Sequence, residues 1–466
     1  MFPQGQIWEF FRMICAVPHP SGHEAELAEA LAAWAEAQNL VVRRFAAGNL
    51  TIYRPPTPGF EGAPHVILQA HLDMVPQSAD GTFDFLSDPI RVESDGEYLH
   101  TDGRTTLGAD NGIGVAMALA ALADPRGGGA LTALFTVEEE TGLTGAAAVT
   151  AAELEAEYLI NLDSEDQGII FVGCAGGGSV RGTLACPLEP TAGTAYKLTL
   201  HGLHGGHSGM EIGKNRGNAI GILAEILREQ PGVRLAEFSG GTLSNVIPSA
   251  ATALIVGVET VAAEPILAKW RNILGANGDN LTLRIEPACA QAACTAADSA
   301  QILRAMALAD GVISFDHRWN IPEASSNLAT AELADGGFTL LASQRAQDDT
   351  LRRELTAKLS AHLEACRLAV EVREAYCGWN PRSDSALLEL ARQTYRELDV
   401  EPKVEVVHAG LECGIFAAVN PNCDMISLGP DIELVHSVEE RVSIASVEFM
   451  VEYLHKLLEK IYSRQK

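Results

Sequence analysis

The chain has 466 residues, of which 47% are hydrophobic and 20% are charged, so it can bury a sizeable core. Its 61 acidic residues outnumber the 33 basic ones, and the net charge of −28 argues against binding to nucleic acid or to an anionic membrane surface. The nine cysteines are scattered without a CxxC pair and no apolar run is long enough to span a membrane, which indicates a cytoplasmic protein with reduced thiols.

The first predicted elements alternate between helix and strand. Ser21-Gly-His-Glu24 has the pattern of a capping box, with His19 and His23 as surface residues beside it, and AELAEALAAWAEAQ predicts the helix that follows. VVRRFAAGNLTIYR then predicts a hairpin. HVILQAHLDMV, ALTALFTVEE and YLINLDSED predict strands, and GIGVAMALAAL predicts a helix between the first two. Strands that alternate with helices predict an α/β sheet.

The pattern changes near residue 188, where AYKLTLHGLHGGHSG begins to alternate apolar and polar residues. Strand and helix patterns up to residue 376 predict an inserted α+β domain, in one piece or in two halves. Residues 377–466 return to the α/β pattern. The expected fold class is therefore α/β: a catalytic domain, a mixed sheet flanked by helices, built from residues 1–187 and 377–466 and interrupted by a lid domain over 188–376.

His71 and Asp73 end a predicted strand. Because they are two positions apart, both side chains point to the same side of an extended chain. A metal-bound histidine usually donates its other N–H to such an oxygen. Alone, the pair fits a core histidine with a hydrogen-bonded neighbour at least as well.

Asp110 lies in TTLGADNGIGVAMA, a glycine-rich stretch that leads into a helix. The stretch has neither GK[ST] nor GxGxxG, so a phosphate loop is not predicted, and a carboxylate in this position suits a cation. Capping of the helix by Asp110 is a compatible alternative.

Five candidates lie at predicted strand ends or in adjoining loops: His71, Asp110, one of the glutamates of VEEE, Asp163 and His436. Ligands in α/β sheets gather at the carboxyl ends of strands. Two imidazoles and three carboxylates suit a pair of divalent ions that share one bridging carboxylate. Glu139 and Glu140 would point to opposite sides of an extended strand, so both can serve one site only if the chain bends near Gly142.

The segments QAHLDMV, TTLGADNGIGVA, TVEEETGLTGA, INLDSED, GLHGGHSG, HAGLECG and HSVEER resemble, in this order, those of the M20 metallopeptidases, and within them the aminoacyl-histidine dipeptidase branch. The resemblance implies a zinc-peptidase-type catalytic domain with a two-zinc site. It makes Asp110 the bridge, and His71 and Asp163 terminal ligands of different ions. Glu140 and His436 are then the remaining ligands, Glu139 is the general base, and Asp73 orients His71.

The resemblance also implies a histidine in the lid domain that contacts the substrate, which corresponds to His207 in GGHSG. His207 could stabilise a developing oxyanion in its own active site or in a partner's, and a turn histidine is the alternative. Arg345, at the end of LLASQR, could bind the carboxylate of the substrate with its planar guanidinium. Arg318 and Arg216 compete for that role.

Glu412 in HAGLECG is placed to recognise a free amino terminus, with Gly410 allowing close approach of the backbone. A solvated loop acid is the alternative. The expected activity is hydrolysis of dipeptides with a free N-terminus, including Xaa-His and β-alanyl-histidine, by a metal-bridging water that Glu139 activates. Two Zn²⁺ ions are expected, and Mn²⁺ or Co²⁺ also suits these ligands.

Two other functions stay open. One is a tripeptidase or an N-acyl amino acid amidohydrolase of the same fold. The other is a catalytically silent protein that binds metal or peptide, which would lack a ligand or the base. The expected partner is a small peptide, and a homodimer through the lid domain is a further option.

Overall fold

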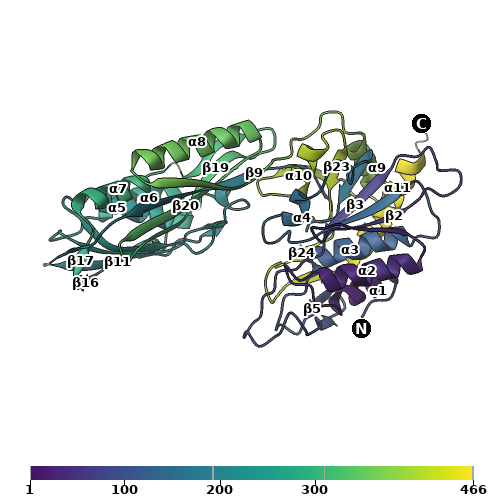
Figure 1. Cartoon of the computed structure of the whole chain (residues 1–466), viewed down its shortest axis with the longest axis horizontal. Coiled ribbons are helices and arrows are strands. Elements are labelled where there is room, and N and C mark those ends of the chain that lie inside the picture. The colour runs from purple at the N-terminus through teal and green to yellow at the C-terminus, as the bar shows by residue number, and fades with distance from the viewer. Residues whose placement is uncertain (1, 192–193, 309, 464–466) are drawn as a thin grey trace. The chain divides into compact units, whose positions relative to one another are not determined.

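The computed structural model describes residues 2–191, 194–308 and 310–463 and divides the chain into two compact units (Figure 1). The first unit comprises Met1–Gly173, Pro381–Val406 and Glu412–Lys466, and the second comprises Cys174–Asn380 and Val407–Leu411. Strand β9 (Gly176–Ala185) already pairs with strands of the second unit, so that unit begins before residue 188. The functional domain limits at 188 and 376 stay a prediction.

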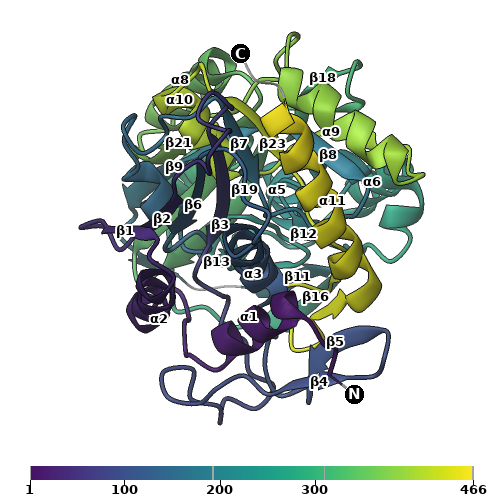
Figure 2. The same cartoon turned by 90° about the vertical axis from the view of Figure 1, so that its right-hand side faces the viewer.

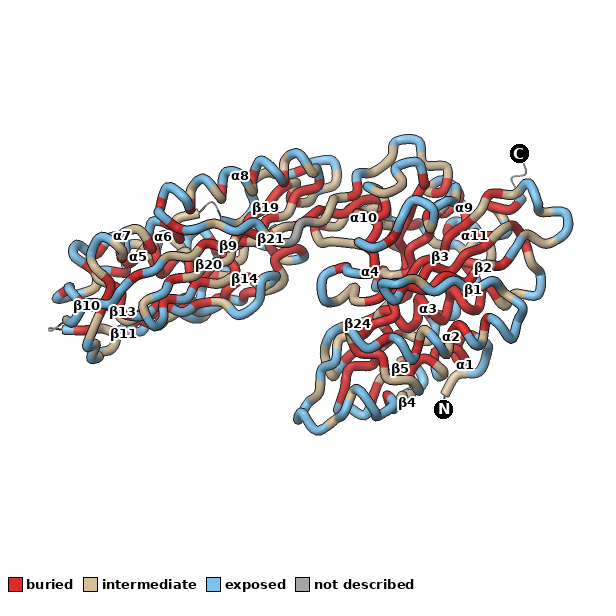
Figure 3. The backbone as a smooth tube through the Cα atoms, viewed as in Figure 1, coloured by how far each residue is buried: buried red, intermediate tan, exposed pale blue. Residues whose placement is uncertain are grey.

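The first unit is built on an eight-stranded mixed sheet (Figure 2). Its strands, in spatial order, are β1 (Val41–Arg44), β2 (Leu50–Arg54), β6 (Leu131–Thr136), β3 (Val66–His71), β7 (Tyr158–Asn161), β23 (Asp424–Ser427), β8 (Ile169–Cys174) and β22 (Lys403–Val407). β3 runs parallel to β6 and β7, and β7 runs parallel to β23. Every residue of β3 and β6 is buried, as expected for central parallel strands covered on both faces. Figure 3 shows the buried course of β3.

The helices of this unit are α1 (Gln6–Cys15), α2 (Ala25–Ala37), α3 (Ala109–Leu122), α4 (Thr144–Ala147), α9 (Ala386–Glu397), α10 (Glu412–Val419) and α11 (Ile444–Ser463). α3 packs on β3 and β6, and α1 and α11 pack against α3. Since α3 contacts neighbours on all sides, almost every one of its residues is buried, which explains its uniformly apolar sequence.

A small second sheet connects distant parts of the first unit. Its strands are β24 (Ile432–Glu433), β25 (Arg441–Ser443), β5 (Tyr98–Thr101) and β4 (Val92–Ser94). β25 pairs with β5, which precedes the loop into α3. The loop between β24 and β25 is therefore attached to the segment that leads to Asp110.

The second unit is an antiparallel sheet covered by helices on one face (Figure 1). Its strands are β16 (Thr282–Ala288), β11 (Ala195–His201), β15 (Ala251–Val256), β13 (Arg234–Gly240), β19 (Ile321–Ala334), β20 (Gly337–Ala346), β9 and β21 (Ala369–Tyr376), with β18 (Gly311–Asp316) paired to β19. The helices are α5 (Ala219–Arg228), α6 (Glu264–Leu274), α7 (Ala296–Ala305) and α8 (Asp349–Ala365). All four contribute to one apolar core, and the predicted α/β fold with an α+β insertion is confirmed.

Two local predictions near the N-terminus are wrong. α2 is present, but its N-cap makes no side-chain hydrogen bond to any residue that the structure describes, so the capping box does not form. Ser21 instead donates its hydroxyl to Asp73 at 2.8 Å, and Glu24 accepts the N–H of Glu138 at 3.1 Å. His19 is buried rather than exposed, and its Nδ1 lies 2.6 Å from a backbone carbonyl. The loop before α2 is thus packed against the ends of β3 and β6.

Candidate metal centre

Three strand ends of the first unit meet at one edge of its sheet. β3, β6 and β7 are parallel, so their carboxyl ends lie side by side. His71 is the last residue of β3, Glu139 and Glu140 follow β6, and Asp163 follows β7. This is the edge at which open α/β sheets bind ligands.

Two further candidates reach this edge from outside the sheet. Asp110 lies in the first turn of α3, where its backbone departs from helical geometry. His436 lies in the loop between β24 and β25 and has a left-handed backbone with φ of 59°. The pairing of β25 with β5 explains how residues so far apart in sequence arrive together.

Asp110 contacts both halves of the cluster. Its Oδ1 lies 3.1 Å from Nε2 of His71, and its Oδ2 lies 3.1 Å from Nε2 of His436. Nε2 of His71 is also 3.2 Å from Oδ1 of Asp163, and Nε2 of His436 is 2.9 Å from Oε1 of Glu140. Among the described residues, the possible ligand atoms form three groups, each within 4.8 Å. Two of them share Asp110, namely His71–Asp110–Asp163 and Asp110–Glu140–His436, and the third is His71–Glu139–Glu140.

This geometry bears on how the candidate ligands would divide between two ions. The resemblance implies that His71 and Asp163 bind different ions, whereas the 3.2 Å contact between their side chains favours a shared ion. The reason is topological, since both follow neighbouring parallel strands, β3 and β7. Glu140 and His436 form the other half.

The donor set fits divalent cations. Oε1 of Glu140 is buried beside His436, yet among the described residues it has no hydrogen-bond partner of acceptable geometry. A contact of this kind is expected between two ligands of one ion rather than between a donor and an acceptor. Imidazole nitrogens and carboxylate oxygens suit Zn²⁺, Mn²⁺ and Co²⁺.

The electrostatics of the cluster also favour a cation. Burial raises the pKa of Asp163 to about 6, with the neighbouring carboxylates adding to the rise and His71 opposing it. Burial favours the neutral form of His436, but Asp110 and Glu140 outweigh it and raise its pKa to about 11. Asp110 and Glu140 therefore hold a proton on His436, and a divalent cation would displace it.

The three consecutive glutamates form a turn whose backbone is held by other carboxylates. Glu138 N–H donates to Glu24, Glu139 N–H donates to Oδ1 of Asp73 at 2.9 Å, and Glu140 N–H donates to Oδ2 of Asp73 at 3.2 Å. Glu138 has a φ of 51°, so the chain bends at this residue, ahead of Gly142. The bend allows both Glu139 and Glu140 to place a carboxylate oxygen within 4.8 Å of His71.

Asp73 is bound less closely to the His71 ring than expected. Nδ1 of His71 lies 2.9 Å from the backbone carbonyl of Asp73 and 3.4 Å from its carboxylate. The carboxylate mainly accepts the two glutamate N–H groups and the hydroxyl of Ser21. The sequence suggested neither Ser21 nor Glu24 as a site residue. The one signal in the sequence that could have identified them is the polar cluster directly before a helix, and the capping pattern assigns that cluster to the end of the helix.

Glu412 is fully buried in the first unit, at the start of α10. Its Oε2 accepts hydrogen bonds from Gln69 of β3 and from Thr136 of β6, the latter at 2.9 Å. Its Oε1 has no hydrogen-bond partner among the described residues. Burial raises the pKa of Glu412 to about 7, with His71 opposing the rise and Asp163 adding to it.

The remaining candidates lie in the second unit. Nη1 of Arg345 donates to the Tyr376 hydroxyl at 2.8 Å, and its buried Nε has no hydrogen-bond partner among the described residues. Gly410 lies against the same ring, where a Cβ would come within 2.7 Å of Tyr376. Nδ1 of His207 accepts the N–H groups of the residues two and three positions later, so the neutral ring carries its proton on Nε2.

The competing arginines already have acidic partners. Arg318 pairs with Asp316 at 2.7 Å, and Arg216 pairs with Glu211 at 3.2 Å. In the described part of the chain, the hydrogen-bond partner of the Arg345 side chain is, in contrast, a neutral hydroxyl. This difference favours Arg345 as the arginine available to a carboxylate.

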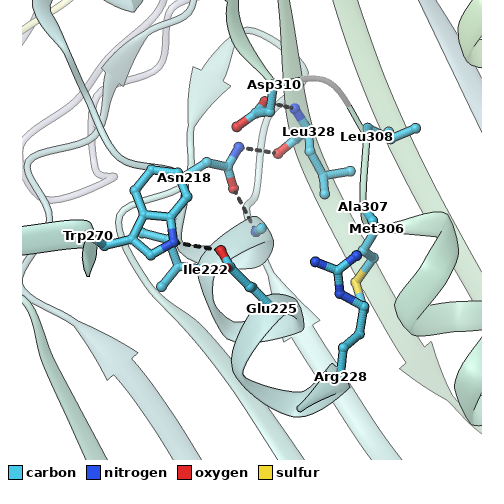
Figure 4. Close-up of a pocket in the computed structure, with 11 residues that line it drawn as sticks. Asn218, Ile222, Glu225, Arg228, Trp270, Met306, Ala307, Leu308, Asp310 and Leu328 are labelled. Carbon is cyan, nitrogen blue, oxygen red and sulfur yellow. Dashed lines mark hydrogen bonds between the residues drawn. The ribbon is translucent and has the colours of Figure 1, made fainter. Parts of the chain in front are cut away.

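A separate pocket of about 280 Å³ lies in the second unit between α5, α6 and the chain around residue 308 (Figure 4). Of the two acids that line it, Glu225 binds Lys269 and the indole N–H of Trp270, and Asp310 accepts the backbone N–H of Leu328 at 2.8 Å. The described residues that line it include none of the candidates above.

Comparisons with known proteins identify the family of this chain. Residues 67–460 match the model of peptidase family M20/M25/M40. The chain is 39% identical to the cytosol non-specific dipeptidase of Escherichia coli (strain K12), over 98% of this chain and 97% of that protein. No helix in the described part of the chain is long and apolar enough to cross a membrane.

Solved structures give the same result. The aminoacylhistidine dipeptidase of Vibrio alginolyticus superposes with a TM-score of 0.83 at 35% identity, covering 99% of this chain and 97% of that one. The aminopeptidase PepT of Bacillus cereus shares the fold, with a TM-score of 0.59 at 17% identity over 99% of both chains. The protein is therefore a peptide-bond hydrolase that belongs to peptidase family M20/M25/M40.

Proposed function

We propose that this chain is a two-metal dipeptidase. The observation that carries the proposal is the position of Asp110, whose two carboxylate oxygens contact different halves of the ligand cluster. His71 and Asp163 would bind one ion, Glu140 and His436 would bind the other, and Asp110 would bridge them. We propose Zn²⁺ as the resident metal, since two imidazoles and three carboxylates suit it.

A bound pair of divalent cations supplies Lewis acidity, which acidifies water and polarises a peptide carbonyl. Glu139 is the proposed general base: its carboxylate takes the proton of the attacking water and passes it to the departing amine. Burial raises the pKa of Glu139 well above its usual value, and the nearby carboxylates add to the effect of burial although His71 opposes it. Burial and neighbouring charges commonly raise the pKa of a catalytic carboxylate towards the working pH of the enzyme. Asp73 fixes the backbone from which Glu139 and Glu140 extend.

A dipeptide places an ammonium group and a carboxylate only a few bonds apart, so an enzyme selective for dipeptides must recognise both. In this proposal Arg345 binds the carboxylate and Gly410 allows close approach of the backbone. Glu412 receives the ammonium group through Oε1, for which the described residues supply no hydrogen-bond partner. His207 donates its Nε2–H to the developing oxyanion. The names of the relatives, a non-specific dipeptidase and an aminoacylhistidine dipeptidase, support this substrate class, including Xaa-His dipeptides and β-alanyl-histidine.

We further propose a cytoplasmic location, which the E. coli relative's description as cytosolic supports. The proposed partner is a small peptide. The net charge of −28 argues against nucleic acid as a second partner.

A hydrolysis panel on chelated and zinc-restored protein tests the proposal. The panel comprises Ala-His, β-Ala-His, N-acetyl-Ala-His and Ala-Ala-His. Zinc-restored protein should cleave the two free dipeptides and leave the acetylated dipeptide and the tripeptide intact. Preference for the acetylated substrate would indicate an amidohydrolase, and preference for Ala-Ala-His a tripeptidase. Metal binding without cleavage of any of the four would indicate a silent binding protein.

A further inference from the structure

Glu440 is a buried carboxylate that no part of the proposed reaction uses. It lies just before β25 and is 2% exposed. Its Oε2 accepts the N–H groups of Leu107 at 2.8 Å and of Gly108 at 3.0 Å. Its Oε1 accepts those of Ala109 at 2.8 Å and of Asp110 at 3.2 Å. One side chain thus accepts four consecutive backbone N–H groups.

These N–H groups belong to the chain that enters α3, where helical geometry offers them no carbonyl partner. A carboxylate is favoured in this position, because the helix dipole is positive there and hydrogen bonds to an ionised acceptor are strong. Gly108 has a left-handed backbone with φ of 71°, and a Cβ there would lie 3.0 Å from the sulfur of Met74. The backbone before Asp110 is therefore held in one conformation by Glu440 and by close packing.

The same loop carries His436. It runs between β24 and β25, with His436 at one position and Glu440 four residues later. Nε2 of His436 contacts Oδ2 of Asp110 across a separation of 326 residues in sequence. The loop thus contacts Asp110 twice, through a candidate ligand at its side chain and through Glu440 at its backbone.

We propose that Glu440 is a positioning residue for the bridging carboxylate. By holding the N–H groups from Leu107 to Asp110, it fixes the direction in which Asp110 leaves the backbone, so that one oxygen faces His71 and the other faces His436. The inference rests on the proposed two-metal site, to which it adds a residue that contacts neither metal nor substrate. It accounts for a buried acid whose side chain accepts four backbone N–H groups.

Glu440→Gln is the informative change, because it keeps the size of the side chain. The amide oxygen can still accept from one pair of N–H groups, whereas the NH₂ group faces the other pair, donor against donor. Glu439→Gln is the matched control, since Glu439 is the exposed neighbour in the same loop. Glu440→Asp keeps the charge on a shorter side chain and serves if the glutamine variant does not fold.

The test measures hydrogen exchange and zinc binding on the chelated proteins. In Glu440→Gln, exchange of the amides at 107–110 should accelerate while the rest of the chain keeps its protection, and zinc affinity should fall by about 10- to 100-fold. Glu440→Asp should show the same two effects with smaller amplitude, and Glu439→Gln should match the wild type. Zinc affinity at the wild-type level in either Glu440 variant would overturn the proposal, as would acceleration of exchange throughout the chain with unchanged affinity. If the wild type itself bound no zinc, the proposed function would fail, and the exchange data would still show whether Glu440 holds residues 107–110.

Discussion

The carboxylate of Asp73 accepts the backbone N–H of Glu139 through Oδ1 at 2.9 Å. The candidate general base is therefore held through its main chain by an acid that follows the neighbouring strand. Oδ2 of Asp73 holds Glu140 in the same way, so one side chain sets the positions of a proposed base and a proposed ligand. Asp73 thus orients the glutamate turn at least as directly as it orients His71.

Asp73→Asn should impair both residues of this turn. An asparagine has one oxygen acceptor, so its NH₂ group would face one of the two glutamate N–H groups. We expect kcat/KM on Ala-His to fall by about 10- to 100-fold with the fold intact by circular dichroism. The control is Asp279→Asn, at an exposed position of the second unit. Equal activity of the two variants would show that the turn does not depend on Asp73.

Glu139→Gln and Glu140→Gln should impair the enzyme in different ways. Loss of the base should lower kcat by about 10²- to 10⁴-fold while both metal ions remain bound. Loss of the ligand should lower the metal content itself, since Glu140 belongs with Asp110 and His436 in one half of the cluster. Metal analysis after dialysis, together with steady-state kinetics, separates the two. Full activity in Glu139→Gln would exclude it as the base.

Tyr376→Phe should weaken substrate binding rather than slow the hydrolytic step. The ring would still fill the space next to Gly410, but the hydroxyl partner of Arg345 would be lost. One such hydrogen bond contributes about 0.5–1.5 kcal/mol, so KM for dipeptides should rise by roughly 2- to 10-fold with kcat nearly unchanged. Tyr196→Phe also loses one hydroxyl hydrogen bond in the second unit and is the control. An equal effect of both changes would argue against a role for Arg345 in binding the carboxylate.

His408 should make the stability of the second unit depend on pH. Burial and the positive charge of Arg345 lower the pKa of His408 to about 3, and its Nε2 lies 2.8 Å from the Ser325 hydroxyl. In the unfolded chain the His408 ring takes up a proton near pH 6.5, whereas the buried ring does so only near pH 3. The contribution of the neutral ring to the free energy of unfolding is therefore complete above about pH 6.5 and is lost as the pH falls towards 3. Between these pH values, the contribution of His408 to the slope of the free energy of unfolding against pH approaches about 1.4 kcal/mol per pH unit.

Urea unfolding between pH 7 and pH 4 measures this slope. His408→Gln keeps a side chain that can hydrogen-bond to Ser325 but does not titrate, so its stability should decline less on acidification than that of the wild type. His204→Gln, at an exposed position, should follow the wild type. Parallel curves for all three proteins would mean that His408 is not held in its neutral form.

The metal-ligand candidates could be predicted because secondary structure alone brings most of them together. His71, Glu140 and Asp163 follow three buried strands, and parallel strands place their carboxyl ends at one edge. Asp110 was marked by a glycine-rich entry to an apolar helix. Strand order was not needed for these choices, although it explains why His71 and Asp163 lie next to each other.

The supporting residues could not be predicted, because their partners are backbone groups of distant loops. Ser21 and Glu24 fit a capping box by pattern, yet they bind Asp73 and the N–H of Glu138. Glu440 stands in a run of charged residues, a pattern that is typical of a solvated loop. Its partners at 107–110 become visible only once β25 is paired with β5. Such contacts depend on loop conformation, which a pattern of residue types does not encode.

The two-metal site is tested most directly by a zinc titration of chelated protein, with the rate of Ala-His hydrolysis followed at each addition. If two ions share Asp110, the chelated protein should be inactive, and the rate should reach its plateau at two equivalents of zinc per chain. Glu139→Gln should take up the same two equivalents and remain inactive. Undiminished hydrolysis by the chelated protein, or a plateau at one equivalent, would contradict the two-metal site.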